Sequence, residues 1–229
     1  MKSDASFDLD DLSSIPDYPP RGADPEARPE PPEPPSDRGP TRSEIMRRRR
    51  IAMLVGGAWL VVLLLLLGVR RDFELSLEVL AHALLPALLG AAALYAALAP
   101  GSVGLGPNAR TTVALAVGGP VAFVVCALAF PAIDGGHPPK AAFFCGDWGL
   151  LLGAVPLAAL VWAQQRTCAA AAPWRSALIG IAMGLVGTAT LGMHCANGDG
   201  WHVALGHGWP VVVFGIIGFG FVGRFTRVR

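Results

Sequence analysis

The residues best suited to chemistry gather near the C-terminal end of the chain. The segment 194–202 reads HCANGDGWH, and His207 follows it five residues later. Thiolate and imidazole groups are the ligands that zinc and copper prefer in proteins. A thiol beside an imidazole can also act as a nucleophile with its base. Because a further cysteine, Cys145, precedes this segment, the residue types indicate thiol or metal chemistry.

Three kinds of site are open to these residues. A disulfide would join Cys145 to Cys195, whereas a sensory thiol or a metal site would use the loop itself. The candidate metal ligands are His194, Cys195, His202 and His207. His194 could instead be a histidine that binds no metal and only forms a hydrogen bond with the backbone. The third kind of site is a catalytic one, with a cysteine as nucleophile and a histidine as base. No hydrolase elbow or metalloprotease helix accompanies the loop, so we expect no enzymatic activity and no cofactor beyond a metal ion there.

The composition places these residues in a membrane protein. Of the 229 residues 53% are hydrophobic and 15% are charged, against about 25% charged in an ordinary soluble domain. This balance excludes a chain that is disordered throughout, a nucleic-acid binder with a basic surface and a disulfide-dense secreted module. We therefore expect an integral membrane protein with a polar tail.

Six apolar segments are long enough to be considered as membrane spans. The segments are Ile51–Val69, Leu77–Ala99, Thr112–Ile133, Trp148–Ala163, Ser176–His194 and Trp209–Gly223. Only helices satisfy their own backbone in lipid unless strands close into a barrel, and alternating strands are absent from the sequence. We expect an all-α bundle of six transmembrane helices, in which the short fourth and sixth spans need tilt or a thinned bilayer.

Small residues mark the expected helix contacts. Gly180 and Gly184 form a GxxxG pair in the fifth span, a pattern that lets backbones approach closely in lipid. Gly118, Gly119 and Pro120 are expected to interrupt the third span. No span has a charge at its centre, which argues against a transporter.

The basic residues predict the orientation of the bundle. With the N-terminus inside, ten basic residues near the membrane lie inside and three outside, which favours two cytoplasmic termini. The ten are Arg47 to Arg50, Arg110, Arg166, Arg175, Arg224, Arg227 and Arg229, and the three are Arg70, Arg71 and Lys140. This orientation puts all five histidines (His82, His137, His194, His202 and His207) and both loop cysteines at the outer side, where disulfides persist.

Residues 1–46 form the polar tail, and residues 47–229 form the predicted transmembrane domain. The tail holds half of the 20 prolines and 11 of the 17 acidic residues, against five basic ones, for a net charge of −6. Such a segment buries too little apolar surface to offset the entropy of ordering. We expect a disordered, cytoplasmic tail.

One stretch of the tail has apolar anchors. Phe7, Leu9, Leu12 and Ile15 lie within a run of acidic residues, and the last three recur at every third position. One or two helical turns would align these three beside an acidic face, as in segments that fold on a partner with an apolar groove. The alternative is a solvated acidic terminus.

The region from about Arg47 to Arg229 resembles the NrsF-type membrane anti-sigma factors of bacteria, which are six-span regulators. Five features carry this resemblance: an arginine-rich start of the first span, Gly68-Val69-Arg70-Arg71-Asp72 after it, Cys145 at the start of the fourth, His194-Cys195 followed by Asp199 and His207, and Arg224 after a glycine-rich last helix. The layout is also similar to that of myxobacterial six-span regulators of the light-responsive carotenoid type.

The resemblance implies a regulator that holds an extracytoplasmic-function sigma factor at the bacterial inner membrane. Its cytoplasmic N-terminal segment would bind the sigma factor, and an outer-side signal would release it for transcription in a stress response. The family's paired outer cysteines, candidate sensors in signal transduction, correspond to Cys145 and Cys195. The implied partners are the sigma factor and the lipid bilayer, without direct contact to nucleic acid, and the oligomeric state is not indicated.

A rival interpretation comes from another class of protein. A membrane protein that handles redox chemistry, a metal or haem would use the outer cluster as its functional centre. Its residues would be His82, His194, Cys195, His202 and His207.

Overall fold

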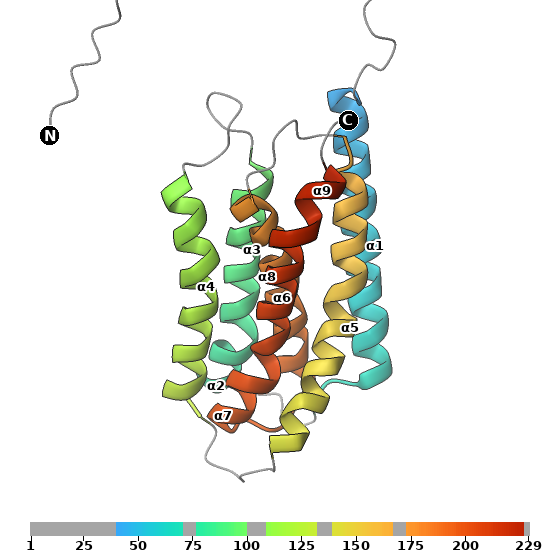
Figure 1. Cartoon of the computed structure of the whole chain (residues 1–229). Coiled ribbons are helices and arrows are strands. Elements are labelled where there is room, and N and C mark those ends of the chain that lie inside the picture. Colours follow the sequence, from blue (N-terminus) through green and yellow to red (C-terminus); the bar gives the residue numbers. More distant parts are fainter. Residues whose placement is uncertain (1–39, 71–76, 100–108, 132–138, 167–172, 227–229) are drawn as a thin grey trace, which may run out of the picture. The chain divides into compact units, whose positions relative to one another are not determined.

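The computed structural model describes residues 40–70, 77–99, 109–131, 139–166 and 173–226, and within these ranges every regular element is helical (Figure 1). The α-helices are α1 (Arg42–Leu67), α2 (Leu77–Val79), α3 (Leu85–Leu98), α4 (Ala109–Ala129), α5 (Pro139–Ala163), α6 (Pro173–His194), α7 (Gly200–His202), α8 (Trp209–Ile217) and α9 (Gly223–Thr226). Three π-helical turns join some of them: η3 (Leu80–Leu84), η4 (Val203–His207) and η5 (Gly218–Val222).

Six helical stretches of the described chain are long and apolar enough to cross a membrane, as the sequence predicts. They are Arg42–Leu67, Leu80–Leu98, Arg110–Ala129, Ala142–Ala163, Pro173–His194 and Gly200–Val222. Helix α1 begins with a capping box, in which Thr41 and Glu44 each bind the other's backbone N–H. This start lies inside the segment assigned to the tail, most of which is outside the described residues.

The prediction that the fourth and sixth spans are short is wrong. Helix α5 continues through Asp147, whose side chain is exposed and therefore does not end the helix. The last span begins at Gly200, because Gly208 keeps αR backbone angles between η4 and α8 and Pro210 lies in the first turn of α8, where proline is tolerated. Helix α4 likewise continues through Pro120 instead of being interrupted there.

Helix α6 is the centre of the bundle and is buried along nearly its whole length. The predicted close approach at its GxxxG pair is confirmed. A Cβ at Gly180 would collide with the carbonyl oxygen of Phe214 in α8, and one at Gly184 would lie 2.5 Å from the Cα of Val211. Since glycine is the only residue that leaves this space, α6 and α8 pack backbone against backbone.

Helix α1 lies at the edge of the bundle and packs mainly on α5 (Figure 1). Gly56 faces Pro156, since a Cβ at Gly56 would lie 3.2 Å from the Pro156 Cβ. The indole N–H of Trp59 donates to the carbonyl oxygen of Leu151 at 3.2 Å. The α1–α5 pair therefore has both a packing contact and a hydrogen bond within the apolar part of the bundle.

The two ends of the bundle differ in chemistry. The arginine end carries Arg49, Arg110, Arg166 and Arg175, and the cysteine end carries Cys145, Cys195, His202 and His207. At the arginine end two guanidinium groups bind the last carbonyl groups of α3. Arg49 donates to Leu98 at 3.4 Å, and Arg175 donates to Ala97 at 2.7 Å and also to Ala99. These contacts satisfy acceptors that a helix C-terminus leaves open.

We expect Gly180→Ala to destabilise the bundle by about 1–3 kcal/mol, because the new methyl group meets a backbone oxygen that cannot rotate away. The matched control is Gly57→Ala, at a helical glycine where a Cβ would meet nothing within 4 Å. Thermal unfolding of both variants in detergent checks this. Equal unfolding midpoints for the two would contradict the packing described for α6.

Candidate functional site

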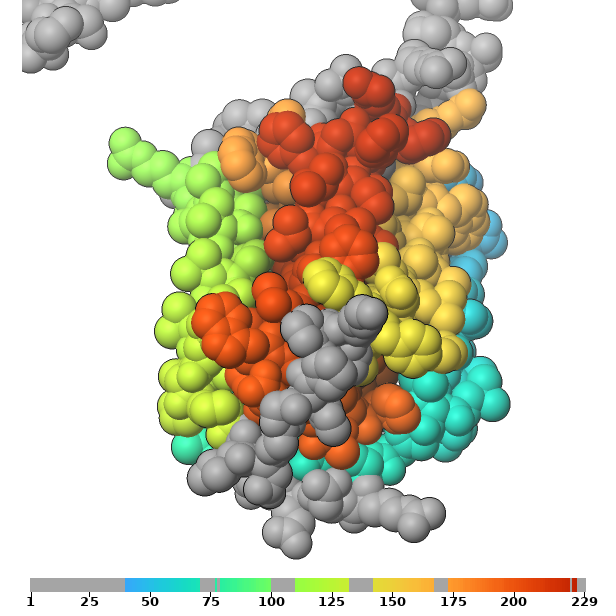
Figure 2. All heavy atoms as spheres, turned by 60° about the horizontal axis from the view of Figure 1, so that its bottom comes forward, coloured from blue at the N-terminus to red at the C-terminus, as the bar shows by residue number. Residues whose placement is uncertain are grey.

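Four side chains meet at the cysteine end. Cys145, Cys195, His202 and His207 each offer one ligand atom, and these atoms lie within 4.8 Å of one another. They come from α5, from the residue after α6, from the end of α7 and from the end of η4. Figure 2 shows this end of the bundle, where the orange-red start of the last span lies between the lime α4 and the yellow α5.

Two glycines bring α5 and η4 into contact beside the ligands. Gly146 follows Cys145, and a Cβ there would lie 2.9 Å from the carbonyl oxygen of Gly206. Gly206 precedes His207, and a Cβ there would lie 2.5 Å from the carbonyl oxygen of Ala142. Because both positions lack a side chain, the backbones of α5 and η4 touch, and the two neighbouring ligands converge.

Local hydrogen bonds position the other two ligands. The Cys195 N–H donates to the Leu191 carbonyl at 2.7 Å, which extends the α6 ladder to the cysteine. The Asp199 carboxylate caps α7 by accepting from the His202 N–H at 2.8 Å. His207 then ends the π-helical turn η4, and such turns are frequent at functional sites.

The distances within the group are close to those around a tetrahedral metal ion and would need a small contraction to bind one. The two sulfur atoms are 3.9 Å apart, and the Cys195 Sγ is 3.5 Å from the His202 Nε2. Zinc bonds of 2.0–2.3 Å place tetrahedral ligands about 3.3–3.8 Å from each other. Two thiols and two imidazoles are a ligand set for Zn²⁺, and the sulfur atoms also suit Cu⁺.

The histidines of the group are buried with open ring nitrogens. His207 is 1% exposed and His202 is 5% exposed. Neither ring nitrogen of His207 has a hydrogen-bond partner, and the Nδ1 of His202 has none. Leaving such groups unpaired in a protein interior costs free energy, so a bound ion that accepts the nitrogen lone pairs would remove that cost.

The surroundings of Cys195 favour its thiolate form. Its pKa lies well below the usual range because Cys145 hydrogen-bonds its sulfur, and the His202 and His207 rings contribute, whereas burial acts in the opposite direction. A thiolate is the form that binds metals and attacks disulfides. The pair can therefore bind a soft cation or undergo oxidation.

The same two sulfur atoms are close enough for a disulfide after a small movement. A disulfide needs a separation of about 2.05 Å, whereas Cys145 and Cys195 are free thiols 3.9 Å apart. Oxidation would draw α5 toward the end of α6. The pairing inferred from the sequence thus agrees with the contact, and the oxidation state stays a prediction.

The other residues singled out in the sequence do not join this group. His194, a predicted metal ligand, points elsewhere: its Nδ1 is 2.8 Å from the carbonyl oxygen of Gly68. His82 is buried in η3, which packs on α6 at Gly192. Residues that fall outside the described ranges are the tail anchors Phe7, Leu9, Leu12 and Ile15, together with His137.

Cys145 is the residue of this group that the sequence analysis assigned to a disulfide or a sensing pair and did not include among the candidate metal ligands. The signal for its second role was present, because a cysteine expected to pair with Cys195 must also lie beside its histidines. The π-helical turn that aims His207 has no comparable sequence signal.

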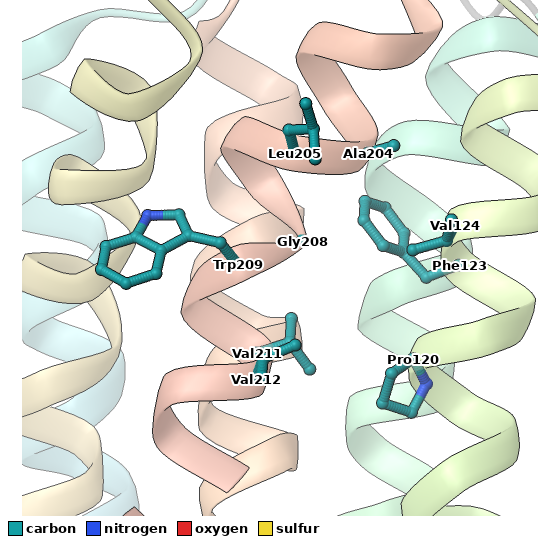
Figure 3. A pocket seen from close by; sticks show the side chains of 9 residues that line it. All are labelled: Pro120, Phe123, Val124, Ala204, Leu205, Gly208, Trp209, Val211 and Val212. Atoms are coloured by element: carbon teal, nitrogen blue, oxygen red, sulfur yellow. The ribbon is translucent and has the colours of Figure 1, made fainter. Parts of the chain in front are cut away.

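A small apolar pocket lies between α4 and the last span (Figure 3). Its volume is about 190 Å³. The lining residues are Pro120, Phe123, Val124, Ala204, Leu205, Gly208, Trp209, Val211 and Val212. In Figure 3 the Trp209 indole points away from Phe123 and Val124. Free volume beside η4 and α8 leaves room for these segments to shift.

Residues 36–227 match the model of a protein family described as NrsF, negative regulator of sigma F. No curated protein and no solved structure matches the chain. The matched region contains all four residues of the Cys/His group and all six apolar helices. It gives no support to the likeness to the myxobacterial carotenoid-type regulators.

We expect the purified chain to bind one Zn²⁺ or Cu⁺ ion, and Cys145→Ser to weaken that binding by more than about tenfold, since removing even an outer partner of a ligand costs 10–100-fold. Affinity falls toward acid pH because the ligands must lose protons. Competition with a chromogenic chelator measures the dissociation constant. The matched control Cys126→Ser alters a free thiol in α4, and equal loss in both variants would contradict a metal site here.

Proposed function

The chain belongs to the NrsF family of negative regulators of sigma F, and from this premise we propose that it is a membrane-bound anti-sigma factor that responds to the state of its Cys/His group. The family makes a sigma factor its partner and implies a regulatory role, not a catalytic one. The observation that carries the sensing part is the convergence of four ligand atoms within 4.8 Å. The sigma factor is proposed to be of the extracytoplasmic-function type.

The proposed location is the bacterial inner membrane, with both chain termini in the cytoplasm. The excess of basic residues at the arginine end supports this orientation, because basic residues are retained on the cytoplasmic side. The Cys/His group then faces the outer compartment, where metal ions and oxidants arrive without crossing the membrane. A signal at one end must therefore act on a partner at the other.

The tail is the proposed element that holds the sigma factor. Its net charge of −6 complements the basic surfaces with which sigma factors contact promoter DNA, and opposite charges give fast, salt-sensitive association. Leu9, Leu12 and Ile15 would supply the apolar contacts of a short helix that folds on the partner. Binding there sequesters the sigma factor at the membrane.

Helix α5 is the proposed connection between the Cys/His group and the tail. It carries Cys145 near its beginning and packs along α1, which leads directly back to the tail. At the arginine end the Arg49 guanidinium donates to the Gln164 side-chain oxygen at 3.4 Å, beyond the last turn of α5. A metal ion or a disulfide that moves α5 relative to α6 would thus alter the position of α1. Such a change acts by shifting the populations of two packing states.

The rival interpretation uses the same group as a functional centre in its own right. A membrane redox, metal- or haem-binding protein would be purified with its cofactor bound and without a sigma factor. Co-purification of a sigma factor favours the regulator, whereas bound haem without a sigma factor favours the rival, because a bound metal ion alone agrees with both interpretations.

We expect Leu9→Ser combined with Leu12→Ser to weaken the binding of the sigma factor by more than about tenfold, because each leucine loses its share of buried apolar surface. Co-purification of the full chain in detergent with the host's sigma factors, at low and high salt, measures the effect. The matched control replaces the same two residues with methionine, which keeps the apolar contact. Unchanged binding in the serine variant would contradict the role of these anchors.

A further inference from the structure

Between α1 and the end of α5, at the arginine end, lies a pocket of about 390 Å³. It is lined by Arg47, Arg48, Ile51, Trp162, Gln165 and Arg166. The volume is in the range of about 300–1,000 Å³ that small-ligand sites occupy. Three of the six lining residues are arginines, and none of these described residues carries a carboxylate.

The four consecutive arginines of α1 are not equivalent in the structure. Arg49 turns to the end of α3, where it binds a carbonyl group. Arg47 and Arg48 share a helix face with Ile51 and line the pocket instead. The nearby carboxylate of Glu44 accepts from the backbone N–H of Thr41 in the capping box and also interacts electrostatically with Arg47 and Arg48. Since three arginines line the pocket and Glu44 is not among its lining residues, the lining keeps a positive charge.

The third arginine reaches the pocket through an unusual backbone conformation. Arg166 has φ = +60°, the only positive φ of a residue other than glycine in the described chain. Glycine is the usual residue at such a helix end. A residue other than glycine in this conformation indicates a functional constraint. At this position glycine would make the turn without strain, but arginine adds a guanidinium group to the pocket.

The pocket also has an apolar side that faces the membrane. Trp162 is 44% exposed and Ile51 is 41% exposed, and Ile51 begins the long uncharged stretch of α1. In the proposed membrane arrangement the arginines lie at the level where a bilayer changes from headgroups to acyl chains, and Trp162 lines the same pocket. Tryptophan is enriched at that level of membrane proteins.

We propose that this pocket binds the phosphodiester headgroup of an anionic phospholipid. Arginine presents a planar pair of donors that matches phosphate oxygens, and basic pockets between transmembrane helices are sites for anionic headgroups. Trp162 and Ile51 contact the glycerol and the first acyl carbons. The lipid bridges α1 and α5, the same pair that connects the Cys/His group to the tail.

The test titrates the full chain in detergent with phosphatidylglycerol, phosphatidylcholine or inorganic phosphate and counts bound lipid by native mass spectrometry. We expect phosphatidylglycerol to bind preferentially. The double variant Arg47→Gln with Arg48→Gln should weaken its binding about 30-fold, since each arginine near the membrane surface contributes about fivefold to the affinity for an anionic lipid. The variant Arg47→Lys with Arg48→Lys keeps the charge and should keep the preference.

The matched control is Arg50→Gln with Arg110→Gln, which removes two exposed arginines that do not line the pocket. We expect its affinity to stay within about twofold of the unaltered chain. Equal losses in the pocket and control variants would overturn the proposal, because diffuse charge would then explain the binding. Equal affinity for phosphatidylcholine would overturn it as well, and inorganic phosphate that binds as tightly as the lipid would show a site for free anions instead.

Discussion

The contact between α5 and η4 at Gly146 and Gly206 is the constraint on which the Cys/His group depends. Each glycine adjoins a ligand in the sequence, and neither position has room for a Cβ beside the facing backbone. Helix α6 extends the same principle through the bundle, because Gly180 and Gly184 let α8 approach its backbone. In lipid, where apolar burial gives helices little preference for one another, such close packing supplies much of the association. Cys145 and His207 thus converge because small residues let α5 and η4 touch, and local hydrogen bonds place Cys195 and His202 beside them.

Most of the fold could be predicted from the sequence, because six long apolar stretches with almost no charged residues have few alternatives in a membrane. The errors lay at the boundaries. Asp147 suggested that the fourth span starts after it, yet one exposed carboxylate does not end a helix. The sixth span was expected to begin at Trp209, whereas the helical stretch begins at Gly200, since Gly208 has αR backbone angles and a first-turn proline at Pro210 is tolerated.

The candidate site was predictable in its residue types and only partly in its membership. Cys195, His202 and His207 are close in the sequence, and the structure brings them together with Cys145, which belongs to a different helix. His194 seemed equivalent to them, but it faces Gly68. Neither the direction in which a side chain leaves its helix nor the π-helical turn before α8 can be read from spacing alone. These features depend on tertiary packing.

The central claim is that the state of the Cys/His group changes the hold on the sigma factor at the other end of the bundle. The most direct measurement is the dissociation constant of the sigma factor for the full chain in nanodiscs, with and without one equivalent of Zn²⁺ or Cu⁺. We expect a change of at least about fivefold, the lower range of allosteric coupling, which is lost in the chain with Cys145→Ser and Cys195→Ser. Equal affinities in the two states of the unaltered chain would contradict the claim.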